Sequence, residues 1–299
     1  MQQETKLEIN LVRKLTGATD EQIKFIDGGF VSRVYLINDG ELVVKFPKLD
    51  NVDYRPEARV IDYLNTLELP MVSLQKVKWL SADGRCIVLY GVKGVPLAKI
   101  ETLSMRQRQS IAEKIGGFLK HIRSLTPDFC KPSEPRNDSL DGWKATFDSL
   151  KDFYTKHFTK AEQAILGRLA DFLPLERKKL GDKFVFTHGD IWNPNVLIDG
   201  NDNVGVIDCG DTGYHEESVD FGFEDFGLRD LVLDCVGADE TLRRKVELRN
   251  DMLYITYPKF MTTMHGEDKA KEKCIPIIRG IIGKYRKKLA CSSKRKRGE

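Results

Sequence analysis

The densest cluster of polar side chains in this 299-residue chain lies in residues 187–197 and continues in residues 206–211. Asp190 and Asn195 are placed at the mouth of an expected β-hairpin, and Asp208 ends the strand that returns. Such a hairpin can bring two carboxylates and an amide to one end of a sheet. Oxygen ligands of this kind suit Mg²⁺, which keeps several waters and shares phosphate oxygens. Each residue alone is also a common turn former, but the three at this spacing predict a metal–phosphate site.

A lysine in the N-terminal region offers a second charged group. Lys45 follows Val43 and Val44 and precedes Phe46, in a strand that is expected to be mostly buried. A charged residue in such a strand needs a partner. Glu57, in the first expected helix, is a natural partner for it.

Hydrophobic periodicity indicates the elements that must position these groups. In the first ~90 residues, Asp-Gly pairs between β-rich runs predict hairpins, and Pro56 opens a helix that ends before Pro70. The strands expected in this part lie at residues 23–27, 31–37, 42–46, 77–80 and 86–90. Beyond Gly94 the pattern becomes mainly helical. Helices are expected within residues 106–125, 139–158, 160–180 and 221–285, and a second hairpin has strands at 184–186, 196–198 and 204–207.

The order of elements predicts an α+β fold made of two lobes. We expect a small N-terminal lobe with an antiparallel sheet and one helix in residues 1–93, including a connector near residues 90–94. A larger, mostly helical lobe follows in residues 94–283. The last segment, residues 284–299, is expected to be a basic and disordered tail.

Composition excludes several classes of protein. With 41% hydrophobic and 31% charged residues, the chain is neither disordered nor fibrous. The longest apolar run, near residues 274–283, contains Arg279 and is about half as long as a membrane-spanning helix. The first residues are polar and acidic, unlike a signal peptide. The six scattered cysteines fit reduced thiols, so a cytoplasmic protein without a membrane partner is expected.

The charge of the chain is unevenly distributed. Residues 284–299 hold eight basic residues and one acid, which leaves 40 basic and 44 acidic residues, a net charge of −4, in residues 1–283. An acidic body suits a cationic substrate and is poor support for binding nucleic acid. A nucleic-acid arm formed by residues 284–297 is a further alternative, tested by salt-dependent binding.

The polar cluster resembles the aminoglycoside phosphotransferase and choline kinase families, small-molecule kinases with a two-lobed, protein-kinase-like fold. The resemblance rests on the motifs His188-Gly189-Asp190-x-x-x-x-Asn195 and Ile207-Asp208-x-x-Asp211. It implies that Asp190 orients the substrate hydroxyl and accepts its proton, and that Asn195 and Asp208 hold Mg²⁺. By the same resemblance, His188 and Asp211 support the loop.

A finer resemblance, to the aminoglycoside 2''-phosphotransferases, rests on residues 45–48, 92–97 and 208–211. The broader kinase resemblance implies that Lys45, paired with Glu57, contacts the α- and β-phosphates of ATP or GTP. The loop of residues 27–32, with Gly29 and Ser32, would cover the phosphates. The finer resemblance implies that the nucleotide base lies against the backbone from Tyr90 to Val92. The carboxylates implied to bind ammonium groups of the drug are Glu216, Glu217, Asp220, Glu224 and Asp225.

The chain departs from the family pattern at His215-Glu216-Glu217, at Cys209 and at Trp192, and these departures leave the substrate open. The predicted function is transfer of the γ-phosphoryl group of ATP or GTP to a hydroxyl of a polycationic aminoglycoside, with the 2'' hydroxyl as the candidate acceptor, as in antibiotic resistance. One alternative is a kinase of a metabolic alcohol such as choline, methylthioribose or homoserine. Another is a nucleotide-binding pseudokinase scaffold. A monomer is expected.

Overall fold

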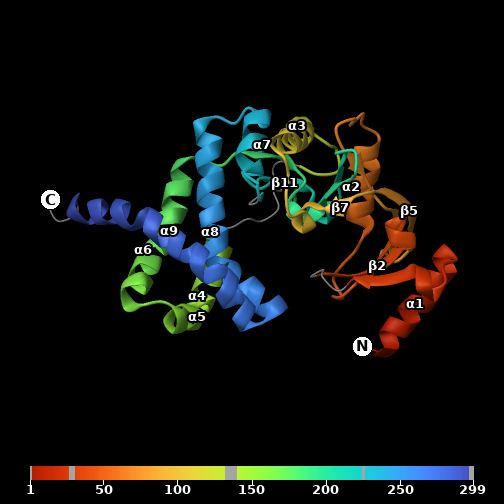
Figure 1. The fold of residues 1–299 in the computed structure, drawn as a ribbon, viewed down its shortest axis with the longest axis horizontal. Coiled ribbons are helices and arrows are strands. Elements are labelled where there is room, and N and C mark those ends of the chain that lie inside the picture. The colour runs from red at the N-terminus through yellow and green to blue at the C-terminus, as the bar shows by residue number, and fades with distance from the viewer. Residues whose placement is uncertain (1, 27–30, 132–139, 224–225, 296–299) are drawn as a thin grey trace. The chain divides into compact units, whose positions relative to one another are not determined.

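The computed structural model describes residues 2–26, 31–131, 140–223 and 226–295, and Figure 1 shows their fold. The chain forms two compact units. The first consists of Met1–Pro132, Phe186–Tyr214 and Asp220–Gly237, and the second of Ser133–Val185, His215–Val219 and Ala238–Glu299. The lobe boundary predicted at residues 93–94 falls inside the first unit, and the division into lobes stays a prediction.

An antiparallel sheet of five strands forms the N-terminal part of the first unit. Its order is β1 (Ile23–Ile26), β2 (Ser32–Ile37), β3 (Leu42–Pro47), β6 (Ile87–Tyr90) and β5 (Lys76–Leu80). In the turn before β3, Asn38 and Asp39 have φ values of 49° and 54°, a left-handed conformation that short polar residues tolerate. This turn sets the register of β2 and β3, in which Lys45 lies opposite Val34. On the other side of β3, Lys45 lies opposite Ile87 of β6.

Helix α2 (Arg55–Asn65) packs against β5. Pro56 lies in its first turn, where the missing N–H has no helical partner to lose. The buried face of α2 consists of Glu57, Ala58, Val60, Ile61 and Leu64. Glu57 is the one charged member of this face, so the helix presents a single carboxylate to the interior.

Helix α1 (Gln2–Thr16) precedes the sheet and is absent from the sequence-based expectations. Glu8 on α1 accepts hydrogen bonds from Arg33 Nη2 at 2.6 Å and from Tyr35 Oη at 2.8 Å, both on β2. Val12 joins Tyr35 and Phe46 in an apolar cluster. These contacts fix α1 to the strand that lies beside β3.

A second sheet combines the predicted hairpin with two short strands from the N-terminal region. Its order is β4 (Ser73–Leu74), β10 (Val204–Val206), β9 (Val196–Ile198) and β7 (Val95–Pro96). β4 runs parallel to β10, and β7 runs antiparallel to β9. Gly205 on β10 is needed for this arrangement, because a Cβ there would lie 2.3 Å from Cγ1 of Val92. The hairpin is therefore held between segments of the first 100 residues.

Helix α3 (Met105–Ile122) packs against α7 (Leu228–Val236) within the same unit. Ser104 caps α3 by accepting the N–H of Gln107. The helix also holds the turn of the β9–β10 hairpin: Lys114 Nζ lies 2.6 Å from the carbonyl oxygen of Asp202, and Gln107 Nε2 lies 3.1 Å from its Oδ1. The turn end of the hairpin is thus fixed by α3.

The second unit is mainly helical. Its helices are α4 (Leu140–Ser149), α5 (Lys151–His157), α6 (Lys160–Lys179), α8 (Glu240–His265) and α9 (Glu267–Arg295). Their shared core includes Leu169, Leu173, Ile255 and Ile278. Strands β8 (Phe184–Thr187) and β11 (Gly213–Glu216), whose residues are divided between the two units, form a two-stranded sheet. Together with the antiparallel N-terminal sheet, these helices confirm the predicted α+β fold class.

Helix α9 corrects the prediction of a disordered tail from residue 284. The helix continues to Arg295, and Tyr285 and Leu289 are buried in the core of the second unit. Lys284 and Tyr285 both donate to Oδ2 of Asp251 on α8. Two apolar residues four positions apart are enough to dock this turn, although basic residues surround them.

Across the described ranges, no helix combines the length and the apolar character that crossing a bilayer requires.

Candidate active site

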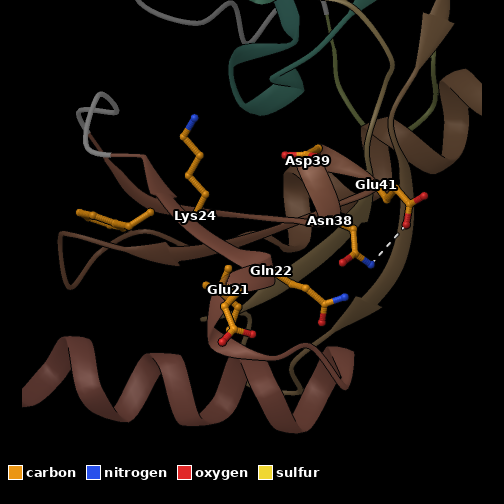
Figure 2. A pocket seen from close by; sticks show the side chains of 8 residues that line it. Glu21, Gln22, Lys24, Asn38, Asp39 and Glu41 are labelled. Carbon is orange, nitrogen blue, oxygen red and sulfur yellow. Dashed lines mark hydrogen bonds between the residues drawn. The ribbon is translucent and has the colours of Figure 1, made fainter.

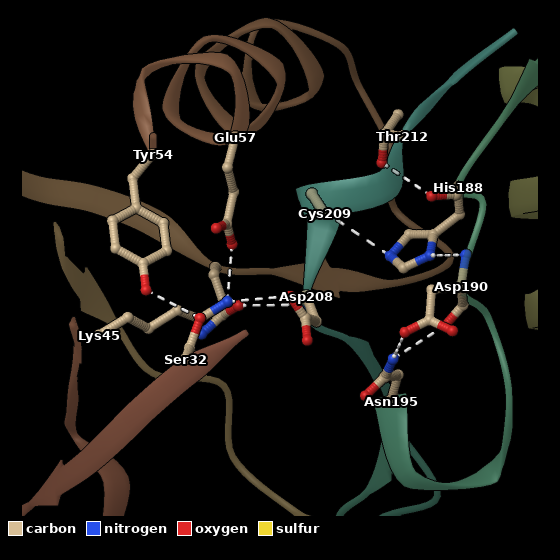
Figure 3. Close-up of polar contacts among 11 residues, drawn as sticks. Ser32, Lys45, Tyr54, Glu57, His188, Asp190, Asn195, Asp208, Cys209 and Thr212 are labelled. Carbon is tan, nitrogen blue, oxygen red and sulfur yellow. Dashed lines mark hydrogen bonds and ion pairs between the residues drawn. The ribbon is translucent and has the colours of Figure 1, made fainter. Parts of the chain in front are cut away.

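The ammonium group of Lys45 lies inside the first unit between two carboxylates (Figure 3). Its Nζ is 2.7 Å from Oε1 of Glu57 on α2 and 2.9 Å from Oδ1 of Asp208, which follows β10. Lys45 and Glu57 are only 6% and 5% exposed. Burial alone would lower the pKa of Lys45, but the two carboxylates outweigh it and raise the pKa. The lysine is therefore a fixed positive charge.

Asp208 faces both the protein and the solvent. Its side chain is 49% exposed, and its backbone has the left-handed values φ 67° and ψ 69°, which a residue other than glycine adopts at a cost. The charge of Lys45 lowers the pKa of Asp208. Its backbone N–H donates to Oε1 of Gln75, a residue that the sequence analysis does not single out. Asp208 is thus an ionised carboxylate with room for a ligand.

The loop after β8 brings Asp190 and Asn195 together, as Figure 3 shows. Nδ2 of Asn195 donates to the backbone oxygen of Asp190 at 2.9 Å and to its Oδ2 at 2.8 Å. Because the amide nitrogen faces Asp190, the amide oxygen faces the opposite way. Burial raises the pKa of Asp190 to about 7, and the charges of Asp208 and Asp211 add to the effect. A carboxylate with a pKa near neutrality suits proton transfer.

Asp220 supports the loop from behind. It is fully buried, and its carboxylate accepts the N–H groups of His188 at 2.9 Å and of Gly189 at 2.8 Å. Gly189 has φ 88°, a conformation that favours glycine. The resemblance implied that Asp220 binds substrate ammonium groups. Both carboxylate oxygens are engaged with the backbone directly before Asp190, and a role of Asp220 in binding substrate stays a prediction.

His188 is buried beside Asp190 and Cys209. Its Nδ1 lies 3.4 Å from the N–H of Asp190, and its Nε2 lies 3.9 Å from Sγ of Cys209. Thr212 Oγ1 donates to the carbonyl oxygen of His188 at 3.0 Å. Asp211 ends the short turn that follows Asp208 and is exposed. The supporting roles of His188 and Asp211 stay predictions.

Glu216 and Glu217 belong to a buried ion-pair network of the second unit, and their role in binding substrate stays a prediction. They are 2% and 6% exposed, and Lys245 on α8 is 3% exposed. Lys245 Nζ lies 3.3 Å from Glu216 and 2.8 Å from Glu217, and Arg177 on α6 lies 2.9 Å from Glu216. Burial opposes ionisation of Glu216, but Ser218, Arg177 and Lys245 outweigh it and lower its pKa. Both charges are already compensated.

The remaining predicted contacts are only partly described. Ser32 is buried at the start of β2, where it accepts a hydrogen bond from Tyr54 Oη at 2.8 Å. No sequence pattern indicates a role for Tyr54, which precedes α2. Tyr90 ends β6 and is 48% exposed, whereas Val92 packs at Gly205. Their contacts with a nucleotide stay predictions, and the predicted residues Gly29, Glu224 and Asp225 lie outside the described residues.

The oxygen atoms of Asn195 and Asp208 fit a magnesium ion that is shared with a nucleotide. Within the described part of the chain, no three His, Cys, Asp or Glu side chains gather into a metal site of their own. Mg²⁺ usually takes one or two protein groups and completes its shell with phosphate oxygens and water. The half-exposed carboxylate of Asp208 and the amide oxygen of Asn195 on the side away from Asp190 match that requirement.

A hollow of about 830 Å³ lies elsewhere on the first unit (Figure 2). It borders β1 and the β2–β3 turn and is lined by Glu21, Gln22, Ile23, Lys24, Phe25, Asn38, Asp39 and Glu41. None of the groups described around Lys45 or Asp190 lines it. We therefore assign the chemistry to the polar cluster of Figure 3 and not to this hollow.

The buried network around Glu217 makes a prediction about stability. Replacing Lys245 with alanine leaves two buried carboxylates short of a partner, so we expect the free energy of unfolding to fall by about 3–5 kcal/mol. Lys183 also pairs with Glu217, at 3.3 Å, but its side chain is 67% exposed. We expect Lys183→Ala to cost about 0–1 kcal/mol. Equal effects in urea unfolding would contradict the assignment of Glu216 and Glu217 to a structural network.

Comparisons with known proteins identify the family of the chain. The profile of the phosphotransferase enzyme family APH matches residues 22–223, a range that contains Lys45, Asp190, Asn195 and Asp208. Curated proteins give no match to the chain.

Solved structures of similar fold include the gentamicin complex of APH(2'')-IIa, with a TM-score of 0.66 and 18% identity over 90% of this chain and 94% of that one. The GDP complex of aminoglycoside 2'-phosphotransferase-IIIa has a TM-score of 0.69 and 15% identity, over 93% and 98%. Choline kinase from Cryptosporidium parvum Iowa II has a TM-score of 0.59 and 14% identity, over 95% and 97%. At these identities the likeness shows a common fold. The family model matches more than half of this chain, which therefore belongs to the APH phosphotransferase enzyme family.

Proposed function

We propose that this phosphotransferase moves the γ-phosphoryl group of ATP or GTP to a hydroxyl group of an aminoglycoside. The observation that carries the proposal is the buried ammonium of Lys45, held 2.7 Å from Glu57 and 2.9 Å from Asp208. A fixed positive charge beside a metal-binding carboxylate is suited to the phosphates of a nucleotide. The resemblance of residues 45–48, 92–97 and 208–211 to the 2''-phosphotransferases favours an aminoglycoside as acceptor.

In this proposal Asp190 is the catalytic residue. Its carboxylate accepts the proton of the acceptor hydroxyl as the oxygen attacks the γ-phosphorus atom. The bond from that phosphorus to the bridging oxygen breaks, and a nucleoside diphosphate leaves. The hydrogen bond from Asn195 holds Asp190 in place, and Asp220 holds the backbone on the other side.

Asn195 and Asp208 are proposed to hold Mg²⁺, which when bound supplies positive charge to the phosphates. Lys45 limits the position of Asp208 through the 2.9 Å contact. Most of the rate then comes from positioning and electrostatics, with no covalent bond to the protein.

A kinase of a metabolic alcohol such as choline, methylthioribose or homoserine is a second candidate. It is favoured by the engagement of Glu216 and Glu217 with Lys245 and Arg177 and of Asp220 with the loop backbone. Three of the five carboxylates expected to bind a polycation are thus occupied. An acceptor with one positive charge or none needs fewer of them.

Asp190→Asn tests the catalytic assignment. The amide keeps the size of the side chain but cannot accept a proton, so we expect kcat to fall by about 10²–10⁴-fold. Nucleotide affinity should stay near that of the wild type, because the nucleotide is assigned to other residues. Asp62→Asn, an exposed residue on α2, serves as the matched control. Turnover of Asp190→Asn equal to that of the control would refute the role of Asp190.

The acceptor is tested by the rate of nucleoside diphosphate release by the purified protein with Mg²⁺, separately with ATP and GTP. We expect kanamycin or gentamicin to accelerate the release. Acceleration by choline, methylthioribose or homoserine alone would replace the aminoglycoside by the second candidate and leave the catalytic residues in place. A rate that none of these acceptors changes would contradict both proposals.

A further inference from the structure

We propose that Gln75 is a positioning residue for phosphoryl transfer, because its side chain fixes the backbone of Asp208. The inference rests on the proposed function, in which Asp208 holds Mg²⁺ at the nucleotide. Gln75 itself touches no reacting atom. It acts by setting where the carboxylate of Asp208 can point.

Gln75 lies at the point where backbone pairing with the hairpin stops. Strand β4 pairs with β10 in parallel as far as Leu74 and Val206, and Gln75 follows directly. Its side chain is buried, with only 3% of the residue exposed. Oε1 accepts the N–H of Asp208 at 3.2 Å. A side-chain acceptor therefore continues the hydrogen bonding of the strand beyond the end of β4.

Asp208 needs such an acceptor because its backbone is left-handed, with φ 67°. A residue other than glycine keeps this conformation only where the surroundings hold it. The preceding N–H, of Ile207, is bound by the carbonyl oxygen of Asn195 at 3.0 Å. Gln75 binds the next N–H, and Lys45 binds the carboxylate. Asp208 is thus fixed at its backbone and at its side chain by two separate segments.

The hydrogen bond between Asp208 and Gln75 also links Asp208 to the C-terminal end of α2. Asn65, the last residue of α2, donates through Nδ2 to the carbonyl oxygen of Gln75 at 2.8 Å and to that of Ile61 at 2.8 Å. Glu57, in the first turn of the same helix, binds Lys45. A closed ring therefore runs from Lys45 through Glu57, α2, Asn65, Gln75 and Asp208 back to Lys45.

The test is Gln75→Met, which keeps the length of the side chain but removes the acceptor oxygen. Mg²⁺ is titrated by calorimetry into the full-length protein saturated with ADP. We expect the affinity for Mg²⁺ to fall by about 10–100-fold, the usual cost of removing a residue that orients a metal ligand. Binding of ADP without Mg²⁺ should change by less than about twofold, because Asp208 contributes to it only through the metal.

Gln107→Met is the matched control. It is the same substitution at the opposite end of the hairpin, where Gln107 Nε2 contacts Asp202, and the affinity for Mg²⁺ should be that of the wild type. A second variant, Asn65→Ala, should weaken Mg²⁺ binding several-fold in the wild type and have no further effect in Gln75→Met, because it acts through Gln75. This variant also tests the inference if Gln75→Met fails to fold.

The outcomes distinguish failure of the proposed function from failure of the inference about Gln75. If the wild type binds no Mg²⁺ in the presence of ADP, the proposed function fails and the inference fails with it. If the wild type binds Mg²⁺ and Gln75→Met binds it equally well, only the inference is overturned. Equal losses of ADP affinity with and without Mg²⁺ would also overturn it, since they indicate general damage to the site.

Discussion

Burial of one positive charge, that of Lys45, is the constraint on which the site depends. An unpaired charge in the interior costs several kcal/mol, so strand β3 can carry this lysine only if carboxylates reach it. Glu57 reaches it from α2, and Asp208 reaches it from a position 163 residues further along the chain. The compensation of a single ammonium group thus brings together the sheet, the helix and the hairpin that form the proposed nucleotide site.

Burial also separates the carboxylates of the chain by role. Glu216, Glu217 and Asp220 are almost completely inaccessible, and each has cations or backbone N–H groups as partners. Asp190 and Asp208 are partly exposed, so an incoming ligand can reach them. These two partly exposed carboxylates lie in the first unit, Asp208 beside Lys45 and Asp190 beside Asn195. A negative charge close to a catalytic motif in sequence is therefore no guarantee of a role in binding.

The groups that sequence analysis identified depend on local patterns. Lys45 lies between buried apolar neighbours, and Glu57 lies just after the proline that opens α2, so both could be predicted. The partners of Glu216 and Glu217 could not, because Lys245 and Arg177 lie on distant helices and a sequence does not state which helix faces which strand. β4 and β7 have two residues each, too few for a periodic pattern. The role of Gln75 could not be predicted for the same reason, since it depends on where β4 ends.

A double-mutant cycle between Lys45 and Glu57 tests the central pairing most directly. The free energies of unfolding are measured for the wild type, Lys45→Met, Glu57→Gln and the double variant. If the buried charges compensate each other, each single change lowers stability by about 3–5 kcal/mol, and the double variant loses about 1–3 kcal/mol less than the sum. Effects that add within about 0.5 kcal/mol would contradict the pairing. They would remove the physical basis for placing Asp208 and the nucleotide beside Lys45.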